Sequence, residues 1–287
     1  MVNLLILALA GFIAQLIDGA LGMGYGVTST TMLLTMGLAP ASVSASVHAG
    51  EVVTTLISGV AHWRFGNVDR EMMWRLGVPG AIGAFCGALF LSSLPVHLAR
   101  PGVSAFLLIL GITVLVRFAR RPRLPAGNRD LPRPKLLMPL GLIAGFFDAT
   151  GGGGWGPIAT PTLLARRHAN PRTVVGTVDA SEFLVALSAT LGFAVALGWQ
   201  QINLQWTLAI IIGGAFAAPL AAWAVRMLPT HMLGIAVGVM ILASNARTIL
   251  SAFGVEIPLA LLLILVAIPA ALTFAVALSK RNVEVDG

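Results

Sequence analysis

Apolar stretches of membrane-spanning length recur along this sequence and constrain its fold more than any other feature. An α-helix needs roughly 20 apolar residues to cross the hydrocarbon core of a bilayer, and residues 98–116 and 257–278 approach or exceed that length. Of the 287 residues, 57% are hydrophobic and only 10% are charged, whereas about a quarter of a soluble domain is charged. Such a chain could not keep its surface in water. The sequence therefore predicts an integral membrane protein.

The spanning elements are expected to be helices. Strands of a transmembrane barrel alternate apolar and polar residues, whereas these segments are apolar on all faces. Glycine (32 residues) and proline (16 residues) are frequent. Small residues let helices approach closely in membranes, and helix breaks are tolerated where neighbouring groups or water satisfy the backbone. We predict an all-α polytopic membrane protein.

The two halves of the sequence resemble each other. Residues 11–18 (GFIAQLID) align with residues 141–148 (GLIAGFFD) at an offset of 130 (141 − 11), and three glycines follow each segment in step. Glu51 aligns with Glu182 at an offset of 131 (182 − 51), each within an apolar segment rich in small residues. A small drift of the offset is typical of loop insertions. The pattern therefore indicates a duplication.

Each half is predicted to contain a short helix, a glycine-rich break, a second short helix and three longer spans. We divide the chain into a first repeat (1–118), a basic linker (119–135), a second repeat (136–255) and an extra C-terminal helix with its tail (256–287). The predicted helices cover residues 2–18, 26–38, 42–61, 74–94 and 100–118, then 136–148, 156–166, 173–197, 205–225 and 230–251, and finally 257–279.

Basic residues predict the orientation. Between residues 117 and 135, seven lysines and arginines face a single acid, Asp130, which is typical of a cytoplasmic loop. Following the predicted spans from this loop in both directions puts the N-terminus outside and the C-terminus in the cytoplasm of a bacterial-type plasma (inner) membrane. The halves then enter the membrane from opposite sides. Inverted repeats with broken helices are typical of secondary transporters.

The glycine-rich breaks, at residues 19–26 and 151–157, are the first candidate site. Glycine lets another group approach the backbone, and the helix N-terminus after each break has unpaired N–H groups that favour anions. Two such termini near the midplane would bind an anion without lysine or arginine; close packing of small residues is the alternative. Nearby hydroxyl groups could line the path. The candidate substrate-binding residues are Gly22, Gly24, Tyr25, Gly26, Thr30, Ser46, Gly152, Gly153, Gly154, Trp155, Gly156, Thr160 and Thr177.

Acidic residues inside predicted spans form the second candidate site. A charge at the bilayer centre costs on the order of 2.5–3.5 kcal/mol on insertion scales, so such residues usually face a cavity or relay protons. His48 precedes Glu51 by three residues, which puts both on one helix face, and Asp179 precedes Glu182 in the same way. We predict that these four residues couple transport to protons. A neutral glutamate bonded to another helix is the alternative.

Two aspartates, Asp18 and Asp148, directly precede the breaks. An acid aimed at an anion would repel it, so we predict that both accept hydrogen bonds from loop N–H groups and hold the loops in shape. Binding of a coupling cation is the alternative. The sequence has no nucleotide-binding motif or metal-ligand set, so no cofactor and no metal is expected.

Three further side chains in predicted spans carry reactive or charged groups. Ser58 and His62 lie four residues apart on one helix, but neither a G-x-S-x-G elbow nor an H-E-x-x-H set accompanies them. An intramembrane enzyme is therefore not expected. Arg247 either extends to the membrane surface or faces the transport path, and the sequence favours neither role.

These features resemble the TauE/SafE family of sulfite and organosulfonate exporters, also known as the TSUP family. The resemblance rests on the glycine-rich segments at 11–26 and 141–156, on Pro157 to Pro161, and on Gly176-Thr177. It implies a duplicated membrane transporter with sulfite, sulfoacetate or a related small anion as its substrate. The first segment departs from the family pattern, because Gln15 stands where a glycine is usual.

We therefore expect a secondary transporter that exports a small anion, sulfite or a short organosulfonate by the resemblance, bound between the two breaks. An importer or a channel for other small anions is the alternative. The expected partners are this anion and the lipid bilayer, and a homodimer is left open. Nucleic acid is not expected, because the basic residues do not interleave with aromatic ones.

Overall fold

A computed structural model of the chain describes residues 4–21, 23–120, 134–164, 171–198, 204–227 and 230–268. All regular secondary structure in these residues is helical. The predicted basic linker and tail lie largely outside them. The helices are α1 (Leu4–Leu21), α2 (Tyr25–Thr35), α3 (Pro40–Arg64), α4 (Arg70–Ser93), α5 (Val96–Arg120), α6 (Pro134–Gly151), α7 (Trp155–Leu164), α8 (Pro171–Leu197), α9 (Leu204–Met227), α10 (Thr230–Ala252) and a last helix at Leu259–Ile268.

The described helices include several that suit a membrane. By length and composition, spans within α3, α4, α5, α8 and α10 could cross a bilayer, and α1, α6, α9 and the last helix contain shorter apolar segments. Large apolar side chains lie on the outer surface, among them Leu5, Ile57 and Phe216 at 75%, 68% and 70% exposure. Such a surface suits lipid and not water. The predicted all-α, polytopic organisation is confirmed.

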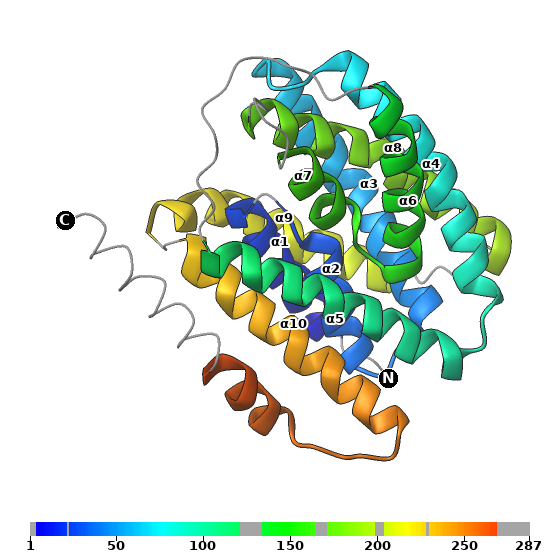
Figure 1. The fold of residues 1–287 in the computed structure, drawn as a ribbon, viewed down its shortest axis with the longest axis vertical. Coiled ribbons are helices and arrows are strands. Elements are labelled where there is room, and N and C mark those ends of the chain that lie inside the picture. Colours follow the sequence, from blue (N-terminus) through cyan, green and yellow to red (C-terminus); the bar gives the residue numbers. More distant parts are fainter. Residues whose placement is uncertain are drawn as a thin grey trace.

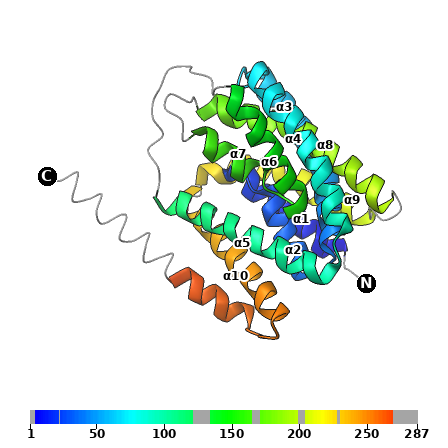
Figure 2. The same cartoon turned by 45° about the vertical axis from the view of Figure 1, so that its right-hand side comes forward.

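The helices form two flanks, and α1 and α2 lie between them. In both views α5 and α10 lie side by side along one flank, whereas α4, α6 and α8 pack together on the other (Figures 1 and 2). α1 and α2 run between the flanks, and α3 packs against α8. The short helix α2 therefore lies inside the bundle, and α7 packs against α6 and α8 with most of its residues buried.

Glycines set the closest contacts between the halves, and they do so reciprocally. A Cβ atom at Gly11 in α1 would overlap the backbone of Ile210 in α9, and one at Gly141 in α6 would overlap that of Leu76 in α4. Gly11 and Gly141 align in the two repeats. The first helix of each repeat thus packs on the fourth helix of the other. This reciprocity supports the duplication, while inversion across the membrane stays a prediction.

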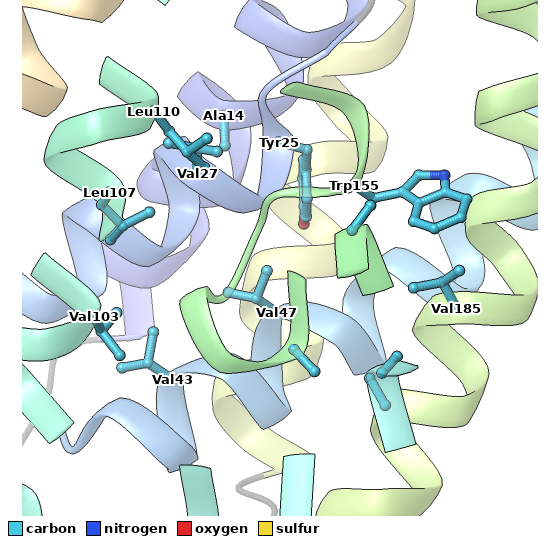
Figure 3. Close-up of a cluster of buried hydrophobic side chains, with 14 of the residues drawn as sticks. Ala14, Tyr25, Val27, Val43, Val47, Val103, Leu107, Leu110, Trp155 and Val185 are labelled. Atoms are coloured by element: carbon cyan, nitrogen blue, oxygen red, sulfur yellow. The ribbon is translucent and has the colours of Figure 1, made fainter. Parts of the chain in front are cut away.

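Buried apolar side chains enclose the breaks (Figure 3). Val103, Leu107 and Leu110 of α5 face α2 and α3, and Trp155, in the first turn of α7, extends toward Val185 of α8. The Trp155 side chain is fully buried. Without a hydrophobic driving force between helices in lipid, such packing holds the bundle together. The breaks are therefore held by dense packing on both sides.

The close approach of α4 and α6 predicts a position where a single methyl group is not tolerated. In Gly145→Ala the added Cβ would overlap the backbone of Gly80, so we expect a loss of roughly 1–3 kcal/mol of stability from overpacking. The measurement is the melting temperature of the purified protein in detergent. Gly102→Ala in α5 is the matched control, because its Cβ would meet nothing within 4 Å. Equal melting temperatures of the two variants would contradict this packing.

Candidate functional site

The two helix breaks, one from each repeat, lie against each other. A Cβ atom at Gly26 would lie 2.6 Å from the Cα of Gly153 and 2.7 Å from Oε1 of Glu51. The Thr30 hydroxyl donates a hydrogen bond to the carbonyl oxygen of Gly152. Gly152 and Gly153 have φ angles of 69° and 140°, which favour glycine. The two predicted breaks thus form one structural unit.

An aspartate caps the short helix after each break. Oδ1 of Asp148 accepts hydrogen bonds from the backbone N–H groups of Gly154 (2.6 Å) and Trp155 (2.8 Å). Oδ1 of Asp18 accepts one from the N–H of Tyr25 (3.1 Å). A carboxylate is favourable at a helix N-terminus because it pairs exposed N–H groups and opposes the helix dipole. Both aspartates make the backbone contacts that the proposed loop-shaping role requires.

His48 of α3 lies within hydrogen-bond distance of Asp148 at the second break. Its Nδ1 lies 2.7 Å from the carbonyl oxygen of Ser44, which can only accept, so Nδ1 carries a hydrogen. Its Nε2 lies 3.1 Å from Oδ2 of Asp148. This distance allows a hydrogen bond between the imidazole and the carboxylate, and it links α3 to the second break.

Glu51 completes a buried cluster with this pair. Its Oε2 lies 3.9 Å from Nε2 of His48 and has no hydrogen-bond partner among the described residues. Single ligand atoms from Glu51, His48 and Asp148 all lie within 4.8 Å of one another. The cluster could hold protons, or a cation coordinated by one nitrogen and two carboxylate oxygens.

Two adjacent pockets, which share six lining residues and are treated together as one cavity, lie at the breaks and along α3. The narrow part of this cavity, about 20 Å³ and room for roughly one water molecule, is lined by glycines of both breaks. Its wider part, about 220 Å³, continues past Thr54 and Ser58 to His62. No lysine or arginine among the described residues lines either part. Both parts are lined by Asp18, Tyr25, Glu51, Val175, Asp179 and Glu182.

The predicted substrate-binding residues divide into two groups. Trp155 faces away from the cavity: its ring packs on Gly80 and its Nε1–H donates to the carbonyl oxygen of Val178 at 3.0 Å. Thr177 accepts a hydrogen bond from the N–H of Asp69 at 2.9 Å. The cavity is lined by Gly24, Tyr25, Gly26, Gly153, Gly154, Gly156 and Thr160 but not by Gly152, Trp155, Thr30, Ser46 or Thr177. Gly22 lies outside the described residues.

The predicted proton-coupling residues are also placed differently from one another. Glu51, Asp179 and Glu182 line the cavity, whereas His48 is buried behind its wall. The sequence pairs His48 only with Glu51. The contact of His48 with Asp148, a hundred residues away, was missed, because no local spacing signals it.

Ser58 and His62 meet Asp179 in an order that differs from a catalytic triad. The Ser58 hydroxyl donates directly to Oδ2 of Asp179 at 2.6 Å, and the same oxygen lies 4.0 Å from Nε2 of His62. In a triad, the histidine stands between the serine and the acid and takes the serine proton. Here the hydroxyl proton is directed at the carboxylate. The arrangement gives Ser58 no adjacent base of that kind.

The known proteins that this chain resembles are described as exporters or membrane transporters. The family model described as "Sulfite exporter TauE/SafE" matches residues 7–248. The "Probable membrane transporter protein YtnM" of Bacillus subtilis (strain 168) is 53% identical over 253 residues, which cover 88% of this chain and 84% of that protein. The "Probable membrane transporter protein YdhB" of the same organism is 27% identical over 194 residues, 67% of this chain and 78% of that protein. No solved structure matches.

Substitution of Asp148 tests whether its contacts with the backbone stabilise the second break. Asp148→Ala removes the acceptor of two backbone N–H groups, and we expect it to cost roughly 0.5–2 kcal/mol of stability. Asp148→Asn keeps a carbonyl oxygen at the cap, and its amide can donate to a neutral His48, so its melting temperature in detergent should stay near that of the wild type. If the alanine variant melts with the wild type, the capping contacts do not stabilise the break.

Proposed function

Because this chain belongs to the sulfite exporter TauE/SafE family of membrane transporters, we propose that it exports a small anion, sulfite or a short organosulfonate, bound where the two breaks meet. One observation carries this proposal: α2 and α7, one from each repeat, both begin at the same cavity. The first N–H groups of a helix have no intrahelical partner, and the helix dipole favours an anion there. Asp18 and Asp148 take some of these N–H groups. By helix geometry, those of Gly26 and Gly156 are left for a substrate oxygen.

The shape of the cavity supports loading from the cytoplasm. In this structure the narrow part at the breaks, about 20 Å³, is too small for an oxyanion until the breaks open, whereas the wider part, about 220 Å³, has room for one. The wider part extends toward His62, near the end of α3 that carries Arg64. Positive charge at this end is what predicts a cytoplasmic location. An anion would therefore enter the wider part from inside, and opening of the breaks would release it outward. An importer of other small anions is the alternative.

The carboxylates of the cavity support coupling to protons. Two like charges 4 Å apart repel by about 4 kcal/mol at an effective dielectric constant of 20, so an anion could not bind beside ionised Glu51, Asp179 and Glu182. Protonation of these groups removes the repulsion. By thermodynamic reciprocity, the anion then promotes proton binding to the same extent that protons promote anion binding. His48 and Asp148, whose side chains lie 3.1 Å apart behind Glu51, would supply or receive it.

Anion flux into proteoliposomes tests the substrate class. We expect sulfite or sulfoacetate to move at a rate well above that of protein-free vesicles, and lactate to move far more slowly, because the two breaks present several N–H groups to a three-oxygen head group. Sulfate completes the comparison. Gly26→Ala, whose methyl group would press on Gly153 and Glu51, should lose most of the flux. A folded protein that moves none of the four anions would contradict the proposed substrate.

The pH dependence of flux tests the coupling. A simple sulfonate suits this assay because its own charge does not change near neutral pH. If one proton binds with each anion, lowering the pH on the loading side should lower the KM about tenfold per pH unit. Glu51→Gln and Glu182→Gln imitate the protonated acids and should flatten this dependence. Glu71→Gln, an exposed residue paired with Arg75, is the control. Full pH dependence in both cavity variants would refute proton coupling through these residues.

A further inference from the structure

A second cavity, near the other end of α2, is basic where the first is acidic. It encloses about 680 Å³ between the C-terminal end of α2, the N-terminal part of α5 and the C-terminal part of α10. None of the described residues that line it is an aspartate or a glutamate. Its basic and hydroxyl lining includes His97, Arg100, Ser244, Arg247, Thr248 and Ser251.

Two arginines in this cavity have unused hydrogen-bonding capacity. Nε of Arg247 and Nε of Arg100 are buried, and neither has a hydrogen-bond partner among the described residues. Nη2 of Arg100 donates to the carbonyl oxygens of Gly37 (2.5 Å) and Leu38 (3.1 Å), which fixes this guanidinium at the cavity wall. Because these Nε atoms have almost no accessible surface, an anion in the cavity would pair with the terminal nitrogens of each guanidinium. A guanidinium presents its donors in a planar fork that matches an oxyanion.

We propose that this cavity binds a small soluble oxyanion of the sulfate or sulfite class between Arg247 and Arg100. The neighbouring hydroxyls of Ser244, Thr248 and Ser251 can donate to its remaining oxygens. On this proposal Arg247 faces the path, which is one of the two roles that the sequence left open.

The position of the basic cavity suggests that it is a second anion-binding site on the export path. The 11 residues of α2 span roughly 16 Å at 1.5 Å per residue, so the basic cavity lies about that far from the breaks. The turn at Gly37 is external in the predicted topology. An anion that leaves the acidic cavity would therefore meet two arginines before it reaches the outside. This role on the path rests on the proposed function, whereas anion binding in the cavity does not.

Thiol modification tests anion binding without transport. Cys86 is the single cysteine, so Ser251→Cys in a Cys86→Ala background places one thiol in the cavity. The protein is held in nanodiscs of zwitterionic lipid, and an anionic and a cationic methanethiosulfonate reagent of similar size are compared. We expect the anionic reagent to react about tenfold faster, as for a difference of about 1.4 kcal/mol in local concentration. Sulfate should slow it.

Further substitutions test whether Arg247 itself causes the preference for the anionic reagent. Arg247→Gln should abolish both the preference for the anionic reagent and the protection by sulfate, and Arg247→Lys should retain the preference because it keeps the charge. Arg75→Gln, in α4 and paired with Glu71, should change neither. Equal rates for the two reagents, or a preference that persists in Arg247→Gln, would overturn the proposal. So would loss of sulfate protection on adding anionic phosphatidylglycerol, since a lipid phosphate would then be the occupant.

The result can be told apart from failure of the proposed function. If the charge preference and sulfate protection are found while no anion crosses proteoliposomes, the cavity binds anions and the export proposal fails. If sulfite or a sulfonate crosses while the reagents react equally, export stands and the basic site is wrong.

Discussion

Backbone hydrogen bonding inside a bundle that excludes water decides how two broken helices can be placed in it. An unpaired N–H or carbonyl group in such surroundings costs several kcal/mol, so each break needs partners near it. Asp18 and Asp148 supply carboxylate oxygens to the N–H groups. On the carbonyl side, Thr30 donates to Gly152 and Ser44 donates to Ala149 at 2.7 Å. These donors come from the opposite repeat, so satisfying the backbone also joins the halves.

This solution has an electrostatic consequence. The carboxylates that cap the breaks, together with Glu51, Asp179 and Glu182, make the site acidic, although the helix N-termini alone would make it positive. His48 lies 3.1 Å from one of these carboxylates, that of Asp148. At the other end of α2 the lining is basic. A transported anion would thus need protons at the breaks but not beyond them.

Local signals predicted the helices and not their contacts. The expected spans at 42–61 and 173–197 correspond to α3 (Pro40–Arg64) and α8 (Pro171–Leu197), because apolar length and turn residues are properties of short windows. The contacts of Asp18 and Asp148 with their own loops span six or seven residues and were also expected. The contact of Ser58 with Asp179 joins residues 121 apart. Such pairs depend on how the helices pack, which a single sequence does not encode in any spacing.

The two repeats differ at the aromatic residue of each break, which is Tyr25 in the first and Trp155 in the second. Trp155 and Tyr25 align across the repeats, yet the Trp155 indole is anchored to Val178 and excluded from the cavity, whereas Tyr25 lines it with a buried hydroxyl that has no partner among the described residues. Before the Trp155 ring can change rotamer it must break its hydrogen bond, a cost that the Tyr25 ring does not carry. The side-chain contacts therefore restrain the break at residues 19–26 less than the break at residues 151–157. If one break opens before the other, we expect it to be the break at residues 19–26.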